Sequence, residues 1–585
     1  MEQKDDDRLR VFALPLIAIT TLAVIAFVAP ITGEHANARW ALLGAGAVLL
    51  AWSAALYRRA RATGGRRIKI VIRRPHWIQP LAHLSIYIYW GTYWPEVGRM
   101  APLIGAQIAF AYAFDMLMVW SRRDTYELGF GPFPIIFSTN LFLWFKPDWF
   151  ALQLAMVALG FAAKELIRWD KGGRTGHVFN PSSFPLAVAS VLLLATSSTD
   201  ITWGPEIAST MSLPRYIYEW LFLVSLPGQI LFGVAIMTLS AVATVHLLSV
   251  AYFAWVGTYF FVGPVPIAVF LGTLLLFTDP ATSPRTDLGR IIYGVLYGAS
   301  VLVCYEIFDQ LELPTFYDKL LPVPFLNLSI RAIDRFASRP KVARVEPGRW
   351  LVRLGERGKN LTYVVIWAAA FLGIRAAHGL GDTHPSNRLP FWVQACDAGK
   401  RNACRILVGK EALSCALGSG WACNELGIVV SDRRPDLARS FPPDGVFRRA
   451  CEIGFEAGCL NRSIVPGTTA WVHRPPSLGD YDVLLEAKAM PDDPTPRDLL
   501  ETACRHGWSD GCVSLGYFYL TGELAPRDPP RALAAFAEAC TRRNPHGCAG
   551  ASDLLRRGDG VAADQARANA LLGRACELGL KTACP

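Results

Sequence analysis

Residues 503–548 read ACRHGWSDGCVSLGYFYLTGELAPRDPPRALAAFAEACTRRNPHGC, and this stretch decides the fold of the carboxy-terminal part of the chain. Two cysteine pairs with the same C-x7-C spacing frame it, Cys504 with Cys512 and Cys540 with Cys548. The first cysteines of the two pairs lie 36 residues apart. A period of this length is typical of a solenoid built from helix pairs.

The same spacing recurs outward from this stretch in both directions. Twelve of the 13 cysteines form such pairs, and the remaining four are Cys396 with Cys404, Cys415 with Cys423, Cys451 with Cys459, and Cys576 with Cys584. An even number of regularly spaced cysteines favours disulfides and an oxidising compartment. The C-x2-C spacing of zinc sites and the C-x-x-C-H motif of attached haem are both missing from the sequence, so we expect no metal.

The segment 511–522, GCVSLGYFYLTG, and its continuation to Cys540 resemble the cysteine-rich subclass of Sel-like repeats, which are relatives of the tetratricopeptide repeat. The resemblance covers about residues 390–585 and is weakest in the first half, where residues 466–496 are inserted. It implies two antiparallel helices per repeat, joined by a disulfide from the end of one helix to the start of the next. It also implies a concave face that binds a protein or peptide. His506 and His546 fall in turn segments and are expected to be solvated surface residues.

The apolar residues of the chain, which is 52% hydrophobic, gather in its first 380 positions. Thirteen segments there read as membrane spans: 11–30, 40–57, 76–94, 101–120, 133–145, 149–167, 179–196, 217–240, 241–256, 261–277, 291–308, 316–333 and 361–377. The first is expected to be a retained span and not a cleaved signal peptide. We predict an all-α fold, with a polytopic transmembrane helix bundle in 1–335, a basic cytoplasmic linker in 336–360, a final span in 361–377 and a disulfide-stapled α-solenoid in 385–585.

The basic residues indicate the orientation of these spans. Lys and Arg number 58 against 48 Asp and Glu, and they gather at 58–74, 122–123, 171–174, 285–290 and 331–359. With thirteen spans and a cytoplasmic amino terminus, all these clusters lie on the cytoplasmic side, as the positive-inside rule requires. The repeats then lie on the extracytoplasmic side of a bacterial inner membrane, where disulfides form. This distribution indicates membrane topology and not nucleic-acid binding.

Charged and imidazole side chains inside the spans each suggest a function or a buried structural contact. Asp115, Glu165 and Arg168 are the charged examples, and an interfacial or satisfied polar role is the alternative for each. His83 and His246 suggest haem or quinone contact, although neither helix carries a second histidine at the spacing of a ligand pair. A buried structural role is therefore favoured for both histidines.

Two stretches have a more specific pattern. The first runs from Lys164 through Arg168 to GHVFNPSSF at 176–184, and the second is TDPATSP at 278–284, followed by a Gly-rich helix. Together with PFLN at 324–327, they resemble a family of membrane proteins that belong to the sodium-pumping NADH:quinone reductase and to the Rnf electron-transport complex. Asn-Pro and Asp-Pro at span ends break the helix, and a simple helix stop is the alternative to a binding site.

The family resemblance implies a flavin attached to a Thr in a Ser-Gly-Ala-Thr-like motif. The corresponding loop, ATSSTDITWG at 195–204, lacks this motif, so we expect no covalent FMN. A non-covalent flavin or a quinone is expected at the broken helix ends, with the predicted cofactor-binding residues Asn180, Pro181, Asp279, Pro280, Thr282 and Ser283.

The sequence supports two functions and assigns no catalytic residue. In the first, the chain is an electron-transport membrane subunit whose repeats recruit an extracytoplasmic partner. In the second, the bundle is an anchor and the repeats act as a non-enzymatic adaptor in envelope assembly or signalling. The expected partners are membrane lipid, a protein or peptide bound by the repeats, and other membrane subunits, but no nucleic acid.

Overall fold

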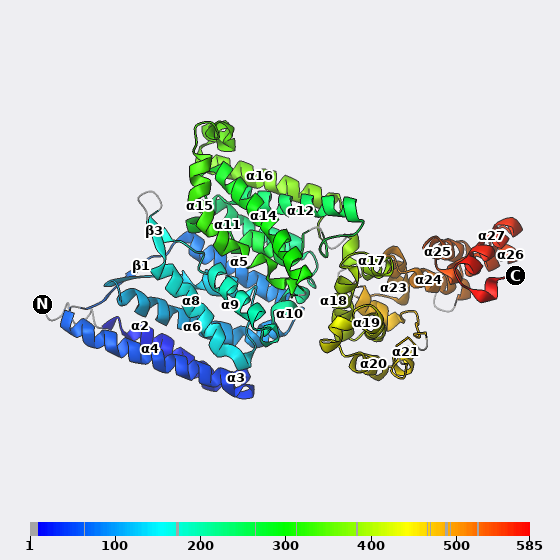
Figure 1. Cartoon of the computed structure of the whole chain (residues 1–585), viewed down its shortest axis with the longest axis horizontal. Coiled ribbons are helices and arrows are strands. Elements are labelled where there is room, and N and C mark those ends of the chain that lie inside the picture. Colours follow the sequence, from blue (N-terminus) through cyan, green and yellow to red (C-terminus); the bar gives the residue numbers. More distant parts are fainter. Residues whose placement is uncertain are drawn as a thin grey trace. The chain divides into compact units, whose positions relative to one another are not determined.

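The computed structural model describes residues 10–63, 65–170, 175–263, 265–311, 313–381, 384–464, 466–467, 470–485, 490–491, 493–522 and 526–585. The chain forms two compact units (Figure 1). Unit 1 comprises Met1–Val250 and Pro264–Gly381, and unit 2 comprises Ala251–Gly263 and Asp382–Pro585. The predicted fold class, an all-α membrane helix bundle followed by a disulfide-stapled solenoid, is confirmed.

Among its described residues, unit 1 is a bundle of helices with four very short strands. The helices are α2 (Ala13–Val28), α3 (Pro30–Glu34), α4 (Ala36–Thr63), α5 (Arg74–Gly91), α6 (Glu96–Trp120), α7 (Pro132–Asn140), α8 (Phe150–Leu166), α9 (Ser183–Ala195), α10 (Gly204–Thr210), α11 (Ile217–Phe232), α12 (Ala235–Val256), α13 (Ile267–Leu271), α14 (Asp287–Gln310), α15 (Pro322–Ala337) and α16 (Gly355–Ala376). Short turns connect them at η1 (Pro147–Trp149), η2 (Thr199–Ile201), η3 (Gly272–Leu276), η4 (Pro280–Thr282), η5 (Thr315–Lys319), η6 (Ala343–Val345) and η7 (Pro347–Leu354). Strand β1 (Arg67–Ile70) pairs in parallel with β2 (Thr125–Leu128), and β3 (Arg168–Asp170) pairs antiparallel with β4 (Thr175–His177).

Each of the thirteen predicted segments contains a helix, but the helices differ in length. Among the described residues, five are long and apolar enough to cross a membrane: Ala36–Ala62, Glu96–Trp120, Pro147–Leu166, Ala235–Val256 and Asp287–Gln310. Four shorter apolar helices accompany them, at Ala13–Val28, Ser183–Ala195, Ile217–Phe232 and Ile267–Leu276. The segment 133–145 holds only the nine-residue α7, which at 1.5 Å per residue falls well short of a bilayer core of about 30 Å.

The outer helices of unit 1 expose large apolar side chains. Phe27 of α2 is 70% exposed, Val48 of α4 is 67% exposed and Leu247 of α12 is 65% exposed. Large exposed apolar side chains of this kind are unfavourable in water and favourable against lipid tails. This surface and the five candidate spans identify a membrane protein.

The ends of the long helices form common layers. At one end, Arg99 near the start of α6 pairs with Glu34 at 2.7 Å, and His35 lies 3.2 Å from Asp148 just before α8. Helices α4, α6 and α8 therefore all begin at this end and finish at the other. The predicted cluster 122–123 lies at the finishing end of α6, whereas 171–174 lies outside the described residues.

The segment 336–360 packs onto unit 1. The Glu346 carboxylate accepts the N–H of Asp287, at the start of α14, at 2.7 Å. The Asp287 carboxylate in turn lies 3.2 Å from Lys359 Nζ and accepts the Tyr363 hydroxyl at 3.0 Å. These contacts order the predicted linker against the amino-terminal end of α14.

Unit 2 is the solenoid. Its helices are α17 (Leu389–Asp397), α18 (Ala403–Ala416), α19 (Gly420–Asp432), α20 (Pro443–Glu452), α21 (Glu456–Asn461), α22 (Leu478–Leu484), α23 (Pro496–Arg505), α24 (Ser509–Thr521), α25 (Pro529–Thr541), α26 (Pro545–Arg557) and α27 (Gln565–Glu577), with short turns η8 (Pro385–Asn387), η9 (Pro435–Arg439) and η11 (Lys581–Ala583). The segment 251–263 belongs to this unit, since Tyr259 and Val262 pack on its core and the Gly263 N–H donates to Ser386 Oγ at 2.6 Å.

All six cysteine pairs close on themselves, each separated by eight residues. In five pairs the bond runs from the end of one helix to the first turn of the next. The third residue after the first cysteine has a positive φ in every pair, and Gly fills this position in five pairs while Arg543 fills it in the sixth. Gly adopts such backbone angles without strain. A loop of this size stabilises the fold by roughly 2–3 kcal/mol on the chain-entropy account.

The inserted segment 466–496 contributes to the solenoid core. Helix α22 begins with a capping box between Ser477 and Asp480. Asp480 is buried and also accepts hydrogen bonds from Ser419 Oγ at 2.8 Å and from the Trp421 N–H at 2.9 Å. Tyr481 is fully buried against Trp508. The insertion therefore joins the first repeats to the last ones.

Candidate functional site

Asn180 is a buried helix cap. Its Oδ1 accepts the N–H groups of Ser182 at 2.8 Å and Ser183 at 3.0 Å, which satisfies the free donors at the start of α9. Pro181 lies at the same turn, where its carbonyl oxygen would be 2.5 Å from a Cβ at Gly160. Only Gly at position 160 allows α8 to approach this turn so closely.

Asp279 organises the second predicted segment. Its Oδ1 accepts the Ala281 N–H at 3.0 Å, and its Oδ2 lies 3.2 Å from Thr282 Oγ1 and 2.7 Å from His177 Nε2. The Ser283 hydroxyl donates to the Asp279 carbonyl at 2.7 Å. Pro280 begins the short turn η4, and the carboxylate holds that turn in place.

The structure brings both predicted segments together. Asn180 Nδ2 donates to the Leu276 carbonyl at 2.8 Å, just before Asp279. The Asn180 N–H donates to Asn327 Oδ1 at 3.0 Å, and Asn327 Nδ2 donates to the Tyr293 hydroxyl at 2.8 Å. His177, Tyr293 and Asn327 therefore complete the cluster. These three residues lie within or beside the two motif stretches, but no sequence pattern identifies them as site residues in the way that the Asn-Pro and Asp-Pro motifs identify Asn180 and Asp279.

These contacts define what the cluster can do. The Asn180 amide and the Asp279 carboxylate are both engaged by protein donors and acceptors, so they fix three chain segments. His83, predicted to be structural, is fully buried with Nδ1 2.8 Å from the Gln79 carbonyl.

A small pocket adjoins this cluster between α5, α11 and η3. Its water-accessible volume is about 10 Å³, which is room for about one water molecule. The lining includes Gln79, Ser225, Gln229, Phe232, Leu274 and Thr278. Gln229 is 2% exposed, and its Oε1 has no hydrogen-bond partner within the described part of the chain.

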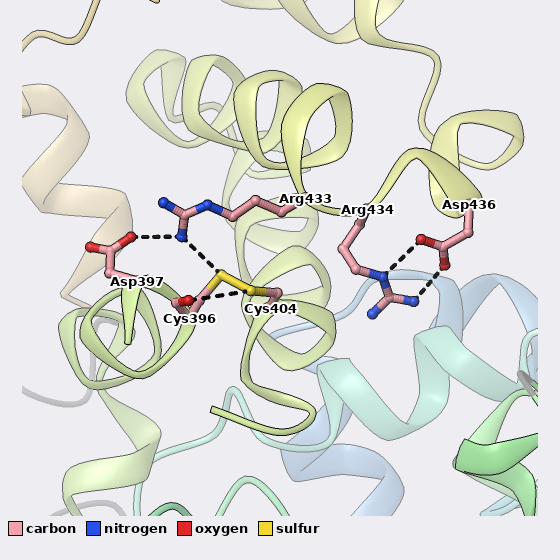
Figure 2. The surroundings of a disulfide bond; sticks show 6 residues. All are labelled: Cys396, Asp397, Cys404, Arg433, Arg434 and Asp436. Atoms are coloured by element: carbon pink, nitrogen blue, oxygen red, sulfur yellow. Dashed lines mark hydrogen bonds and ion pairs between the residues drawn. A yellow bond between two sulfur atoms is a disulfide. The ribbon is translucent and has the colours of Figure 1, made fainter. Parts of the chain in front are cut away.

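In the solenoid, a charged network surrounds the first disulfide. Figure 2 shows Arg433 extending from the end of α19 to Asp397 and Cys396, with Nη1 2.7 Å from the carboxylate and 3.3 Å from the sulfur. The neighbouring Arg434 turns the other way and forms a two-point pair with Asp436. Both arginines are thus neutralised within the solenoid.

Arg388, Arg505 and Arg542, which we call the arginine triad, are arranged differently. A Cβ at Gly507 would lie 3.3 Å from Arg542 Nη1 and 3.6 Å from Pro390 Cβ, so the starts and ends of distant repeats meet here. Burial and the positive charges of Arg542 and Arg505 lower the pKa of Arg388.

Few acidic groups balance the triad. Arg542 Nε donates to Glu538 at 2.7 Å, and Arg505 Nη2 donates to Thr502 Oγ1 at 3.3 Å. Within the described ranges, no carboxylate forms an ion pair with Arg388 or Arg505. The helix dipole favours Arg505 and Arg542, which stand at the ends of α23 and α25, but disfavours Arg388 at the start of α17.

Comparisons with known proteins cover parts of the chain. Cytochrome c oxidase assembly factor 7A of Xenopus laevis is 36% identical over 88 residues, which are 15% of this chain and 38% of that protein. Cytochrome c oxidase assembly factor 7 of Xenopus tropicalis is 35% identical over 89 residues, again 15% and 38% of the two chains. This chain thus spans little more than a third of the length of these curated relatives.

A crystal structure of a protective antigen from uropathogenic Escherichia coli, described as displaying an SLR fold, covers 51% of this chain and 57% of its own. Its sequence identity is 16% and its TM-score is 0.19, too low to carry an argument. No protein-family model matches the chain. The resemblance of the membrane part to the redox family therefore stays a proposal.

Proposed function

We propose that the chain is a membrane-anchored repeat adaptor whose solenoid binds an acidic segment of a partner protein through the arginine triad. The triad carries this proposal, since Arg388 is a half-buried cation that has no paired carboxylate among the described residues and lies near Arg505 and Arg542, of which only Arg542 is paired, with Glu538. Solenoids commonly offer extended surfaces to protein partners. Guanidinium groups bind carboxylates with two parallel hydrogen bonds.

Two further observations support an adaptor. Six closed disulfides are stable in an oxidising compartment, which favours an extracytoplasmic solenoid anchored in a bacterial inner membrane. The partly matching relatives are named assembly factors. We therefore propose a role in assembling a membrane complex, with no catalytic residue of its own.

Peptide binding tests this function directly. Full-length protein in neutral detergent is titrated against a fluorescein-labelled peptide that alternates Glu and Leu, with binding followed by fluorescence anisotropy. The double substitution Arg388→Gln with Arg505→Gln is expected to weaken binding at least tenfold. Hydrogen bonds to charged groups contribute about 1.5–3 kcal/mol each, and about 1.4 kcal/mol corresponds to tenfold in affinity.

Arg448→Gln is the matched control, because this exposed arginine lies on α20 beside Asp444. It should leave peptide affinity unchanged, and a peptide with Gln in place of Glu should bind poorly. Equal binding by the triad variant and the wild type, or equal loss in the control, would contradict the proposal.

A second candidate function rests on the pocket beside the Asn180–Asp279 cluster. Gln229 Oε1 has no hydrogen-bond partner among the described residues and would accept a hydrogen bond from a quinol hydroxyl. The pocket itself has room for about one water molecule, so a quinone head group would have to displace side chains that line it. This candidate retains the electron-transport role. Gentle purification should then yield quinone or non-covalent flavin, reduced by Gln229→Leu; well-folded protein without either would remove the candidate.

A further inference from the structure

Glu165, in the last turn of α8, is surrounded by three arginines. Its carboxylate lies 2.5 Å from Arg123 Nη2, 3.5 Å from Arg168 Nη1 and 3.7 Å from Arg122 Nε. The carboxylate is almost fully buried, whereas the three guanidinium side chains are a third to a half exposed. One negative charge therefore faces three positive charges. The net positive charge is carried by the guanidinium groups, which are exposed to solvent or lipid. We call these four residues the Glu165 cluster.

Neighbouring charges do not remove this excess. Asp115 is engaged by Lys164 at 3.6 Å and by the Tyr126 hydroxyl at 3.1 Å. Asp124 pairs with Arg66 at 2.8 Å, and Glu127 pairs with Arg73 at 2.9 Å. Each of these nearby carboxylates is paired with another cation, so the Glu165 cluster keeps its net positive charge.

The position of the cluster indicates its depth in the membrane. Arg122 and Arg123 follow Ser121, the C-cap of α6, and Glu165 is the second-last residue of α8. Both helices are candidate membrane spans, so their ends lie at the level of lipid head groups.

An aromatic residue marks the same level. Trp169 follows Arg168, its ring lies 4.6 Å from the Arg331 guanidinium, and its Nε1 is buried without a hydrogen-bond partner within the described residues. Tryptophan is enriched at membrane interfaces because its ring is apolar and its N–H is polar.

We propose that the Glu165 cluster binds the phosphate of an anionic phospholipid head group. Arg122 and Arg123 supply exposed guanidinium groups that match phosphate oxygens, and Arg168 adds a third charge. Free phosphate has the same chemistry, but a site at the ends of two spans favours the lipid, whose acyl chains lie along the apolar helices.

Lipid binding to purified full-length protein tests this site. Protein in neutral detergent is titrated with phosphatidylglycerol or phosphatidylcholine, and bound lipid is counted by native mass spectrometry. Phosphatidylglycerol is expected to bind at least tenfold more tightly, and Arg122→Gln with Arg123→Gln should remove that preference. Arg99→Gln is the matched control, because Arg99 is fully compensated by Glu34 and Glu96, each at 2.7 Å, at the opposite end of the helices.

Glu165→Gln separates binding from folding. This substitution keeps the side-chain shape and removes the competing carboxylate, so phosphatidylglycerol should bind more tightly than to the wild type. Weaker or unchanged binding in this variant would overturn the proposal, as would equal affinity for the two lipids or a similar loss in Arg99→Gln. Competition by inorganic phosphate at the lipid's own concentration would assign the site to free phosphate instead.

Discussion

Gly547→Val is expected to destabilise the solenoid by about 1–3 kcal/mol or more. A Cβ at Gly547 would lie 2.4 Å from Ala539 Cβ, 2.8 Å from the Cys540 nitrogen and 2.9 Å from the Phe536 carbonyl oxygen. Two of these atoms belong to the backbone of α25, which cannot turn aside as a flexible side chain can. The extra methyl groups of Val must therefore force α25 and α26 apart. Urea-dependent proteolysis of full-length protein measures the free energy of unfolding.

Gly573→Ala is the matched control in the same solenoid. This glycine lies inside α27, and a Cβ there would meet no atom within 4 Å. Alanine should stabilise the helix by roughly 0.5–1 kcal/mol because Gly loses more backbone freedom on folding. The packing account fails if Gly547→Val unfolds at the wild-type urea concentration, or if both substitutions shift it in the same direction.

The sequence predicts this close packing because the same pattern of Ala, Cys and Gly recurs in several repeats. Gly458 and Gly511 occupy the same position as Gly547, and a Cβ at each would lie 2.4 Å and 2.7 Å from the Ala that precedes the first cysteine of its pair. The fixed spacing of Cys, Gly and Ala thus indicates a close contact between two consecutive helices. Local contacts of this kind explain why the repeat architecture was visible without a structure.

Tertiary contacts were not visible in the same way. Asn180 and Asp279 were predicted to bind a cofactor, but whether their polar atoms stay open depends on Asn327 and His177, which the fold brings to them. That prediction stays untested. The arginine triad was missed because position 388 is more than a hundred residues from 505 and 542.

The membrane segments show a third limit of sequence patterns. Apolar composition identified segment 133–145, but α7 ends at Asn140 and the chain continues without a helix to η1. Hydropathy measures how favourable a segment is in lipid. The position of the helix end depends instead on the hydrogen bonds that the backbone before Pro147 forms with other parts of the fold. The Phe145 N–H, for example, donates to Gln153 Oε1 at 3.0 Å.

The central claim is that the disulfide-closed repeats are displayed outside the cytoplasm on a membrane anchor. It predicts that a phosphatase reporter, which is active only outside the cytoplasm, is fully active when fused after Pro585. The same reporter placed after Arg344 should be inactive, because the basic segment 331–359 favours the cytoplasmic side. The two fusions should differ at least tenfold in activity per molecule.

Reporter fusions at these two positions, normalised to protein level in intact cells, are therefore the most direct measurement. The account predicts high activity after Pro585 and background activity after Arg344. Background activity after Pro585, or equal activity at both positions, would contradict it.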